Sequence, residues 1–577
     1  GNLSLSNSGE TVTLRNSGGG VINSLTYSSL TNQSYARNSD LTGSGEGHNS
    51  IGSNPLNFSP GRYNSSNTPF TTLTWTGATD NAWTTGTNWS TGTVPIATDD
   101  VQILKATNQP TVSTAVTVNS VTINSGASLI ATNTFSGTAT YNRTLANGSQ
   151  WYLMSSPVIS ETYNAAWATA NSILTSSLDT DNIGISTYDN TSLDTDDDVG
   201  GPDTATGNWR YLQTNDSNSD TFNVGQGYGI IRDGSGSVSF TGTGIHTTSQ
   251  TFGITQGASN NFNMVGNPFT SFLNLGDFFA DNPMTTVLVA TEAYFWNGTD
   301  YDTRTSALHS AFEIAPGQGF FVEAAANTNL TFDITDVTHQ ATETFQKSSR
   351  PEIHLFLSDG KNSKYANIYY IDGTTTGYDN GYDGKLFGGI EHSFALYTHL
   401  VSESEGKNYQ LQSLPNSDLE SMIIPVGLKV KANKEITFST ETLNLPERLN
   451  VFLEDREMNV FTNLDEGDYK ITLNEGVDGI GRFYLHTSSK AALSIDDNLG
   501  LDNINIYKAN KSTLRIVGLQ QGKASVKLFT ILGKQIMASS FTSNGVKDVS
   551  LPNLAAGVYV VQLETESGKL NKKIILE

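Results

Sequence analysis

Hydrophobic and polar residues alternate with a period of two along most of this chain. Clear examples are residues 116–123 (Val-Thr-Val-Asn-Ser-Val-Thr-Ile), 428–432 and 557–563. Successive side chains of a strand point to opposite faces, so this alternation predicts half-buried strands. Asn-Gly, Asp-Gly and Gly-Gly pairs between them provide the positive φ angles of tight hairpins. The pattern predicts an all-β protein of tandem β-sandwich modules, Ig-like or jelly-roll, with a short β-solenoid-like segment.

The length and the shifts in composition predict several domains. A chain of 577 residues has room for about four, at one domain per roughly 150 residues. The expected segments are a partial sandwich, a Trp-rich β-solenoid-like module, a duplicated β-sandwich region, a further β-sandwich and a terminal domain, with the bounds 1–68, 69–140, 141–345, 346–490 and 491–577.

The segment 141–345 contains an internal duplication. The paired stretches are 151–157 with 262–268, the helical stretches 160–174 with 271–280, 185–188 with 293–296, Gly225-Gln226-Gly227-Tyr228 with Gly317-Gln318-Gly319-Phe320, and 238–240 with 330–332. Self-similarity of this kind indicates a repeated supersecondary unit. Two related half-sheets are expected to pack as one sandwich or as two twinned lobes.

Composition excludes several classes of function. The formal net charge is −24, with 56 acidic against 32 basic residues, whereas a nucleic-acid binder needs a basic face to neutralise phosphates. The absence of cysteine excludes disulfides, thiolate zinc sites and cysteine nucleophiles. No apolar run reaches the 18 or so residues of a membrane span, and Gly1 opens no signal peptide, so an export signal is expected to lie upstream or to have been removed.

No catalytic centre is predicted from the motifs. The eight histidines are scattered without His-x-x-x-His spacing, and no Gly-x-Ser-x-Gly elbow occurs. We therefore expect a protein that is not an enzyme.

An Asp-rich insertion is a candidate calcium site, because carboxylate oxygens are the ligands of hard cations. Val199 stands where an EF-hand needs glycine, and a solvated, self-repelling loop is the alternative. Asp379 and Asp383 form a second, weaker pair, and paired carboxylates also occur in glycosidases. The residues of the calcium candidate are Asp194, Asp196, Asp198 and Asp203.

Three tryptophans of the second segment are a candidate platform for stacking sugars of external glycans. They are Trp75, Trp83 and Trp89. Core packing is the favoured alternative, since buried aromatic side chains dominate core energetics. This segment resembles the short β-solenoid-like modules of large Bacteroidetes surface proteins.

The C-terminal segment differs from the rest in charge. Residues 502–577 hold ten basic and five acidic residues, and their alternation predicts about seven short strands in a small sandwich. Four sequence features follow one another along this segment: the stretch 526–534, Leu551-Pro552-Asn553-Leu554, Gly557-x-Tyr559-x-Val561 and the final strand 568–575. In these features the segment resembles the type A sorting domain of the type IX secretion system. It departs from that family at Tyr507-Lys508-Ala509-Asn510, where Tyr-Pro-Asn-Pro is usual.

The resemblance implies an export route. An outer-membrane translocon and a shuttle β-barrel would recognise the domain, and a surface transpeptidase would remove it and join the protein to lipopolysaccharide at the cell surface. The signal residues carried over are Gly533, Lys534, Gly557, Tyr559, Lys569, Lys572 and Lys573.

The N-terminal segment resembles the second half of a bacterial lamin-tail domain. The matching stretches are Leu-Ser-Asn-Ser-Gly-Glu-Thr-Val-Thr-Leu at 5–14, 34–37 and 59–62. Half a sandwich cannot bury its own face, so a longer protein is expected. Two hypotheses follow: a non-catalytic adhesin or binding protein for glycans or surfaces, or the accessory tail of a secreted hydrolase or nuclease.

Overall fold

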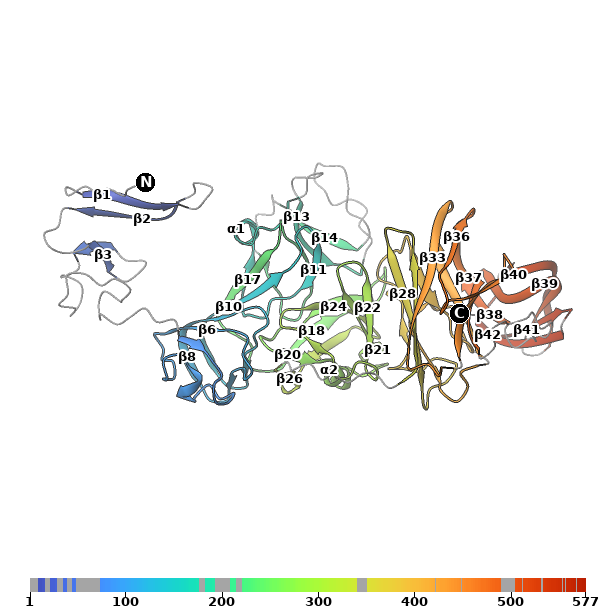
Figure 1. The fold of residues 1–577 in the computed structure, drawn as a ribbon, viewed down its shortest axis with the longest axis horizontal. Coiled ribbons are helices and arrows are strands. Elements are labelled where there is room, and N and C mark those ends of the chain that lie inside the picture. The colour runs from blue at the N-terminus through green and yellow to red at the C-terminus, as the bar shows by residue number, and fades with distance from the viewer. Residues whose placement is uncertain are drawn as a thin grey trace.

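The regular secondary structure of the computed structural model is almost all β-strand, which confirms the predicted all-β class (Figure 1). The part of the chain that it describes contains two short α-helices, and no helix there is long and apolar enough to cross a membrane. The residues that the structure describes are 9–15, 21–28, 35–38, 44–47, 73–175, 182–191, 208–213, 220–339, 350–420, 422–447, 449–488, 504–510, 512–530, 533–552, 554–555, 557–566 and 568–576.

The N-terminal segment contributes two antiparallel strand pairs. The pairs are β1 (Gly9–Arg15) with β2 (Val21–Ser28), and β3 (Tyr35–Asn38) with β4 (Ser44–Gly47). The stretch 59–62 of the lamin-tail resemblance lies outside the described residues, so that resemblance stays a prediction.

A short stack of parallel strands follows, with the geometry of a β-solenoid. The successive strands β5 (Leu73–Trp75), β6 (Asp100–Ile103), β8 (Val116–Ile123) and β10 (Phe135–Leu145) pair in parallel, and β7 (Thr111–Val112) pairs in parallel with β9 (Ile130–Ala131). Alternate residues of β8 are buried, which is why its period-two pattern predicted it correctly. The later strand β17 (Gly236–Gly242) pairs antiparallel with β10 and extends this sheet.

The duplicated region folds into two four-stranded sheets with the same strand order. In lobe one the order is β11-β16-β13-β14, and in lobe two it is β19-β24-β21-β22. The strands of lobe one are β11 (Trp151–Met154), β13 (Asn182–Tyr188), β14 (Trp209–Gln213) and β16 (Tyr228–Ile231). Those of lobe two are β19 (Phe262–Gly266), β21 (Leu288–Trp296), β22 (Tyr301–Thr305) and β24 (Gly319–Ala324). The equal order shows that the duplication in the sequence is also one of topology.

Each lobe carries a helix that is shorter than the sequence predicted. The helix α1 (Ala165–Ala170) follows the short strand β12 (Thr162–Tyr163), and α2 (Leu275–Asp281) follows β20 (Phe272–Asn274). The cause is capping, because the side chains of Asn164 and Asn274 accept a hydrogen bond from the third residue after them and start each helix late. The remaining strands of the region are β15 (Asp220–Thr221), β18 (Gln250–Ile254), β23 (Glu313–Ile314), β25 (Thr328–Phe332) and β26 (Val337–Thr338).

The two lobes are joined by an exchange of equivalent hydrogen bonds. Ser155 N donates to Gly317 O at 2.8 Å, and Gly266 N donates to Gly225 O at 3.0 Å. Both acceptors are the first glycine of a Gly-Gln-Gly turn, with φ of +75° at Gly225 and +63° at Gly317. A Cβ on Gly317 would lie 2.7 Å from Ser155 O. The lobes are therefore related by an approximate twofold axis, and glycine is needed where they touch.

A larger sandwich follows the lobes, built from one eleven-stranded sheet that folds over itself. Its two ends share a core, as shown by Phe438 and Phe483, whose ring centroids are 5.0 Å apart although their strands are distant in the sheet order. The strands are β27 (Glu352–Ser358), β28 (Ser363–Ile371), β29 (Gly384–Lys385), β30 (Ala395–Thr398), β31 (Tyr409–Pro415), β32 (Ile423–Val430), β33 (Lys434–Leu443), β34 (Asn450–Asp455), β35 (Val460–Asn463), β36 (Tyr469–Leu473) and β37 (Val477–Ser488).

The described residues of the terminal domain form five strands, not the seven that alternation predicted. They are β38 (Asn505–Asn510), β39 (Thr513–Thr530), β40 (Gln535–Ser550), β41 (Gly557–Thr565) and β42 (Gly568–Leu576). The first part of β39 pairs with β38 and the end of β40, whereas its second part pairs with the start of β40 and with β41. Register shifts between Val517 and Gly522 separate these parts. The two long strands β39 and β40 therefore each contribute to both sheets of a small sandwich. In the sequence, each of them has the pattern of two short strands.

A buried ion pair joins lobe two to the following sandwich. Lys385 Nζ lies 2.7 Å from Glu292 Oε1, and the Lys385 backbone N–H donates to Glu292 Oε2 at 2.7 Å. The Glu292 side chain is only 1% exposed, so Lys385 is its compensating charge.

We expect Lys385→Met to lower the free energy of unfolding by roughly 3 kcal/mol, because it leaves the Glu292 carboxylate buried and uncompensated. Urea unfolding measures the change, and the double variant Glu292→Gln/Lys385→Met should recover part of it. Lys470→Met is the matched control, since Lys470 pairs with Glu435 at the surface and its loss should not be measurable. Equal effects of the two lysine variants would contradict this role of the ion pair.

Candidate functional site

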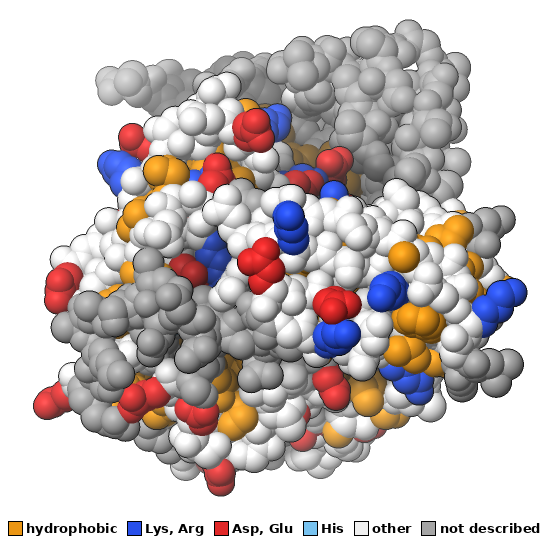
Figure 2. Space-filling view, turned by 90° about the vertical axis from the view of Figure 1, so that its right-hand side faces the viewer, with side chains coloured by type: hydrophobic (Ala, Val, Ile, Leu, Met, Phe, Trp, Pro, Cys, Tyr) orange, Lys and Arg blue, Asp and Glu red, His pale blue; other side chains and the backbone are white. Residues whose placement is uncertain are grey.

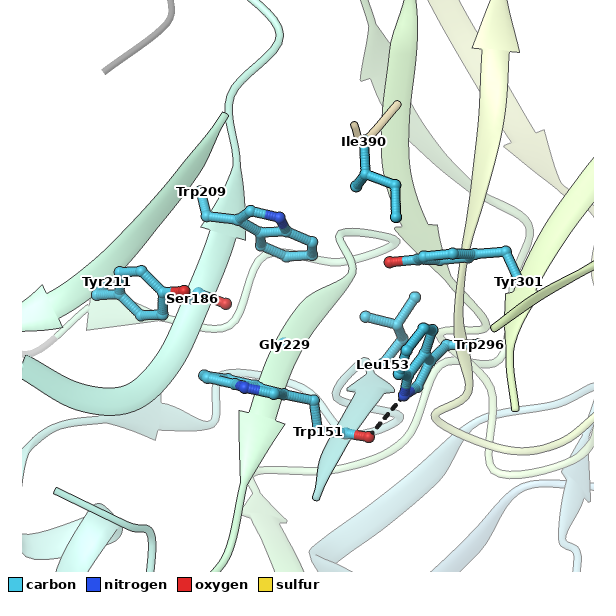
Figure 3. A pocket seen from close by; sticks show the side chains of 9 residues that line it. All are labelled: Trp151, Leu153, Ser186, Trp209, Tyr211, Gly229, Trp296, Tyr301 and Ile390. Atoms are coloured by element: carbon cyan, nitrogen blue, oxygen red, sulfur yellow. Dashed lines mark hydrogen bonds between the residues drawn. The ribbon is translucent and has the colours of Figure 1, made fainter. Parts of the chain in front are cut away.

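An aromatic cleft lies on the sheet of lobe one, where it faces lobe two and a loop of the following sandwich (Figure 3). Its volume is about 200 Å³, and its lining is mostly apolar. Lobe two contributes Trp296 and Tyr301, and the loop contributes Ile390. The residues from lobe one are Trp151, Leu153, Ser186, Trp209, Tyr211 and Gly229.

The cleft exists because lobe one has small residues where lobe two has large ones. Ser186 pairs with Gly229 across β13 and β16, and at the same register of lobe two Tyr294 pairs with Phe321 across β21 and β24. Two aromatic rings of lobe two therefore have no counterpart in lobe one. The missing rings leave the floor of the cleft open.

In lobe two the equivalent face is filled from the sandwich. Phe387, which follows β29, has its ring centroid 4.3 Å from that of Tyr301, 4.8 Å from that of Phe321 and 5.0 Å from that of Tyr294. The same sheet position is thus a packed core in one lobe and an open cleft in the other.

The walls of the cleft are held before any ligand arrives. The Trp209 ring packs edge-on against Tyr188 at 5.4 Å, and the Trp296 indole N–H donates to Trp151 O at 2.9 Å. The ring of Trp151 lies beside Gly229, where an added Cβ would meet it at 3.4 Å. Rings fixed in this way lose little side-chain freedom on binding, which favours affinity.

The chemistry that the cleft offers is stacking plus neutral hydrogen bonds. Its polar side chains include the hydroxyl groups of Ser186, Tyr211 and Tyr301, and none of the described residues that line it is charged. Burial raises the pKa of Tyr211 and of Tyr301, so both phenols stay protonated near neutral pH. The described lining therefore provides neutral hydroxyl donors and acceptors.

The three tryptophans of the solenoid lie in its core. Trp75, Trp83 and Trp89 are 1%, 2% and 2% exposed. Trp89 packs edge-on against the other two rings, at 5.1 Å from Trp75 and 4.7 Å from Trp83. A buried indole presents no face to a sugar, so the platform interpretation does not fit and the core-packing alternative does.

The structure does not test the four calcium candidates of the Asp-rich insertion. Asp194, Asp196, Asp198 and Asp203 lie outside the described residues, and within those residues no group of three or more acidic or histidine side chains is arranged to hold a metal ion. That possible calcium site stays a prediction.

The second candidate pair of carboxylates, Asp379 and Asp383, accepts hydrogen bonds from the backbone of a loop. Asp383 accepts from the backbone N–H groups of Ser413 and Asp379, both at 2.7 Å, and Asp379 accepts from Thr375 N at 2.6 Å. Burial raises the pKa of Asp383 to about 7.

The predicted signal residues lie on strands and turns of the terminal sandwich. Gly533, with φ of +81°, and Lys534 form the turn between β39 and β40, and Gly557 begins β41. The buried Tyr559 donates its hydroxyl to Ala555 O at 2.8 Å.

The three lysines of β42 have different surroundings. Lys569 pairs with Glu564 at 3.1 Å, Lys572 Nζ donates to Asn505 Oδ1 at 2.7 Å, and Lys573 is exposed. On this end of the molecule acidic and basic side chains are interspersed (Figure 2).

Sequence reasoning missed every residue of the aromatic cleft. The signal was present in the duplication, since Gly229 and Phe321 follow directly after the aligned motifs 225–228 and 317–320. A small residue opposite a large one in an internal repeat indicates a hollow in one copy. Composition pointed to the solenoid instead, where the tryptophans are closest together.

Comparison with known proteins identifies the terminal domain. Residues 501–577 match the family model described as a secretion system C-terminal sorting domain. Residues 297–486 match a domain of unknown function (DUF8693); the match begins after β21, includes β22 and β24 of lobe two and extends through most of the following sandwich. The sorting domain supports the prediction that the chain is a secreted protein, a cargo of the type IX secretion system.

Other comparisons add little. None of the curated proteins matches the chain. A solved structure titled a polysaccharide lyase is similar over 39% of this chain and 39% of its own, with 6% identity and a TM-score of 0.12, which is too low to indicate a common fold.

Proposed function

We propose that this secreted type IX cargo is a non-catalytic glycan-binding protein, an adhesin of the cell surface, whose aromatic cleft takes one neutral sugar ring. The proposal rests on the open floor of the cleft at Ser186 and Gly229, between the rings of Trp151 and Trp209. The apolar C–H face of a pyranose packs on aromatic rings, and its hydroxyls need neutral partners such as those of Tyr211 and Tyr301.

The absence of charge in the lining restricts the ligand class. A uronic acid or a sulfated sugar would need a cation to compensate its buried charge, and the lining provides none among the residues that the structure describes. Neutral hexoses and their oligomers fit the site better. The finer steps of export belong to the same proposal, which the sorting domain supports: recognition by an outer-membrane translocon and a shuttle β-barrel, and anchoring by a surface transpeptidase.

A glycan array tests the proposed function. The purified secreted chain should bind neutral oligosaccharides and leave those that carry uronic acid or sulfate unbound. Trp209→Ala should lose the signal, whereas Tyr378→Ala, which removes an exposed aromatic ring outside the cleft, should keep it. Binding restricted to acidic glycans, or equal in the two variants, would refute the proposed ligand class.

Sugar binding should not change between pH 5 and pH 8. The titratable side chains that line the cleft are Tyr211 and Tyr301, whose pKa values are raised by burial and therefore lie above this window. Both phenols keep their protons throughout it, so neither hydrogen bond changes. Isothermal titration calorimetry at three pH values measures the affinity, and a change of more than about threefold, roughly 0.65 kcal/mol, would show that a charged group takes part.

A further inference from the structure

The sorting domain does not extend freely from the chain but packs on the preceding sandwich. A cluster of buried side chains combines Tyr507 and Val517 of the sorting domain with Ala395, Tyr397 and Ile480 of the sandwich. Leu386 of the sandwich and Val546 of the sorting domain pack against the same cluster. We propose that this contact is a clasp that holds the sorting domain in place even after the chain between Ser488 and Ile504 has been cut.

Tyr507 is the central side chain of this clasp. Its ring lies over Gly406, where an added Cβ would come within 2.5 Å of it, and its centroid is 5.9 Å from that of His399. Burial lowers the pKa of His399 to about 4, so the imidazole beside the Tyr507 ring is neutral at physiological pH. Tyr507 is also the first residue of the Tyr-Lys-Ala-Asn stretch that stands where Tyr-Pro-Asn-Pro is usual in the sorting-domain family. The residue thus has a packing role in this chain.

Glycines allow the two backbones to approach closely at a second point. A Cβ on Gly481 of β37 would overlap the side chain of Val546 on β40. One on Gly545 would lie 2.9 Å from Gly481 O. Gly481 has φ of +117° and Gly545 has φ of +86°, conformations that other residues rarely adopt. Close backbone approach at two glycines together with an apolar cluster is typical of a specific interface.

The clasp makes removal of the sorting domain a two-step event. Cutting the chain removes the covalent link, but the apolar cluster still buries Tyr507 and Val517 against the sandwich. Release then exposes Ala395, Tyr397 and Ile480 to water, which costs free energy in proportion to their apolar area. This inference concerns the sorting domain alone and is independent of the aromatic cleft.

The test is to insert a site-specific protease sequence between residues 488 and 504 of the full chain, to cut it, and to separate the products by size-exclusion chromatography with light scattering. The clasp predicts that the sorting fragment elutes with the rest of the chain. Separate elution of the two wild-type fragments under native conditions would overturn the proposal.

A matched pair of variants shows whether the clasp is the cause. Val546→Asp places a charge in the interface and should raise the dissociation constant of the cut fragments by more than about tenfold. Val560→Asp makes the same change at a half-buried valine of β41 outside the cluster and should leave them together. Unchanged thermal melting of the uncut variants shows that both sandwiches are folded. Equal release by the two variants would contradict a clasp at Val546.

Discussion

Replacing Gly229 with phenylalanine is expected to abolish sugar binding without unfolding the protein. The new ring takes the place that Phe321 takes in lobe two and fills most of the roughly 200 Å³ of the cleft. An added Cβ at this position lies 2.5 Å from Ser186 Oγ, so the double variant Ser186→Gly/Gly229→Phe relieves the contact and should behave in the same way. Affinity measured by calorimetry should fall by more than about 100-fold, or about 2.7 kcal/mol.

The control for this variant is Gly253→Phe. Gly253 is an exposed residue of β18, and an added Cβ there meets only the end of the Asn329 side chain, at 3.8 Å. The Gly253→Phe variant adds the same ring to the duplicated region but outside the cleft. It should bind the sugar as the wild type does. Retained binding in a folded Gly229→Phe protein would show that the ligand site lies elsewhere.

Deletion of residues 502–577 is expected to stop export at the outer membrane. The deleted segment is nearly the whole matched sorting domain. The remaining chain keeps the core that the solenoid shares with lobe one, the core of lobe two and that of the β27–β37 sandwich. The truncated protein should accumulate in the periplasm of a competent host, with less than about a tenth of the wild-type amount outside the cell. Immunoblots of periplasmic and external fractions measure the distribution.

The reciprocal experiment separates an export signal from a mere loss of stability. A soluble reporter fused to residues 501–577 should reach the cell exterior, because the five strands of this domain enclose their own core. Display of the truncated protein at normal levels, or a reporter that stays inside, would contradict the export role.

The sequence pattern predicted where strands lie, but it did not always predict where one strand ends and the next begins. Alternation located β8 well because its apolar residues are buried and the polar residues between them are exposed or half-buried. It placed a strand at 428–432, whereas β32 begins at Ile423 and runs through Gly427, where the register shifts and an added Cβ would overlap the ring of Tyr397. A bulge interrupts the period of two without ending the strand, so a single sequence cannot distinguish it from a turn.

The candidate site was less predictable than the fold. Trp75, Trp83 and Trp89 lie close together in the sequence and suggested a surface platform, yet packing placed them inside the solenoid. Trp151, Trp209 and Trp296 lie far apart in the sequence and meet only because two lobes and a loop assemble around the cleft. Contacts across such distances depend on tertiary packing, which local patterns do not encode.

The most direct measurement is X-ray diffraction from crystals of the secreted chain grown with the neutral oligosaccharide that binds most tightly on the array. A glycan-binding cleft predicts one pyranose ring over Gly229, between the rings of Trp151 and Trp209, with a hydroxyl in hydrogen-bonding distance of Tyr211 or Tyr301. A sugar ordered elsewhere on the molecule while the cleft stays empty would contradict it.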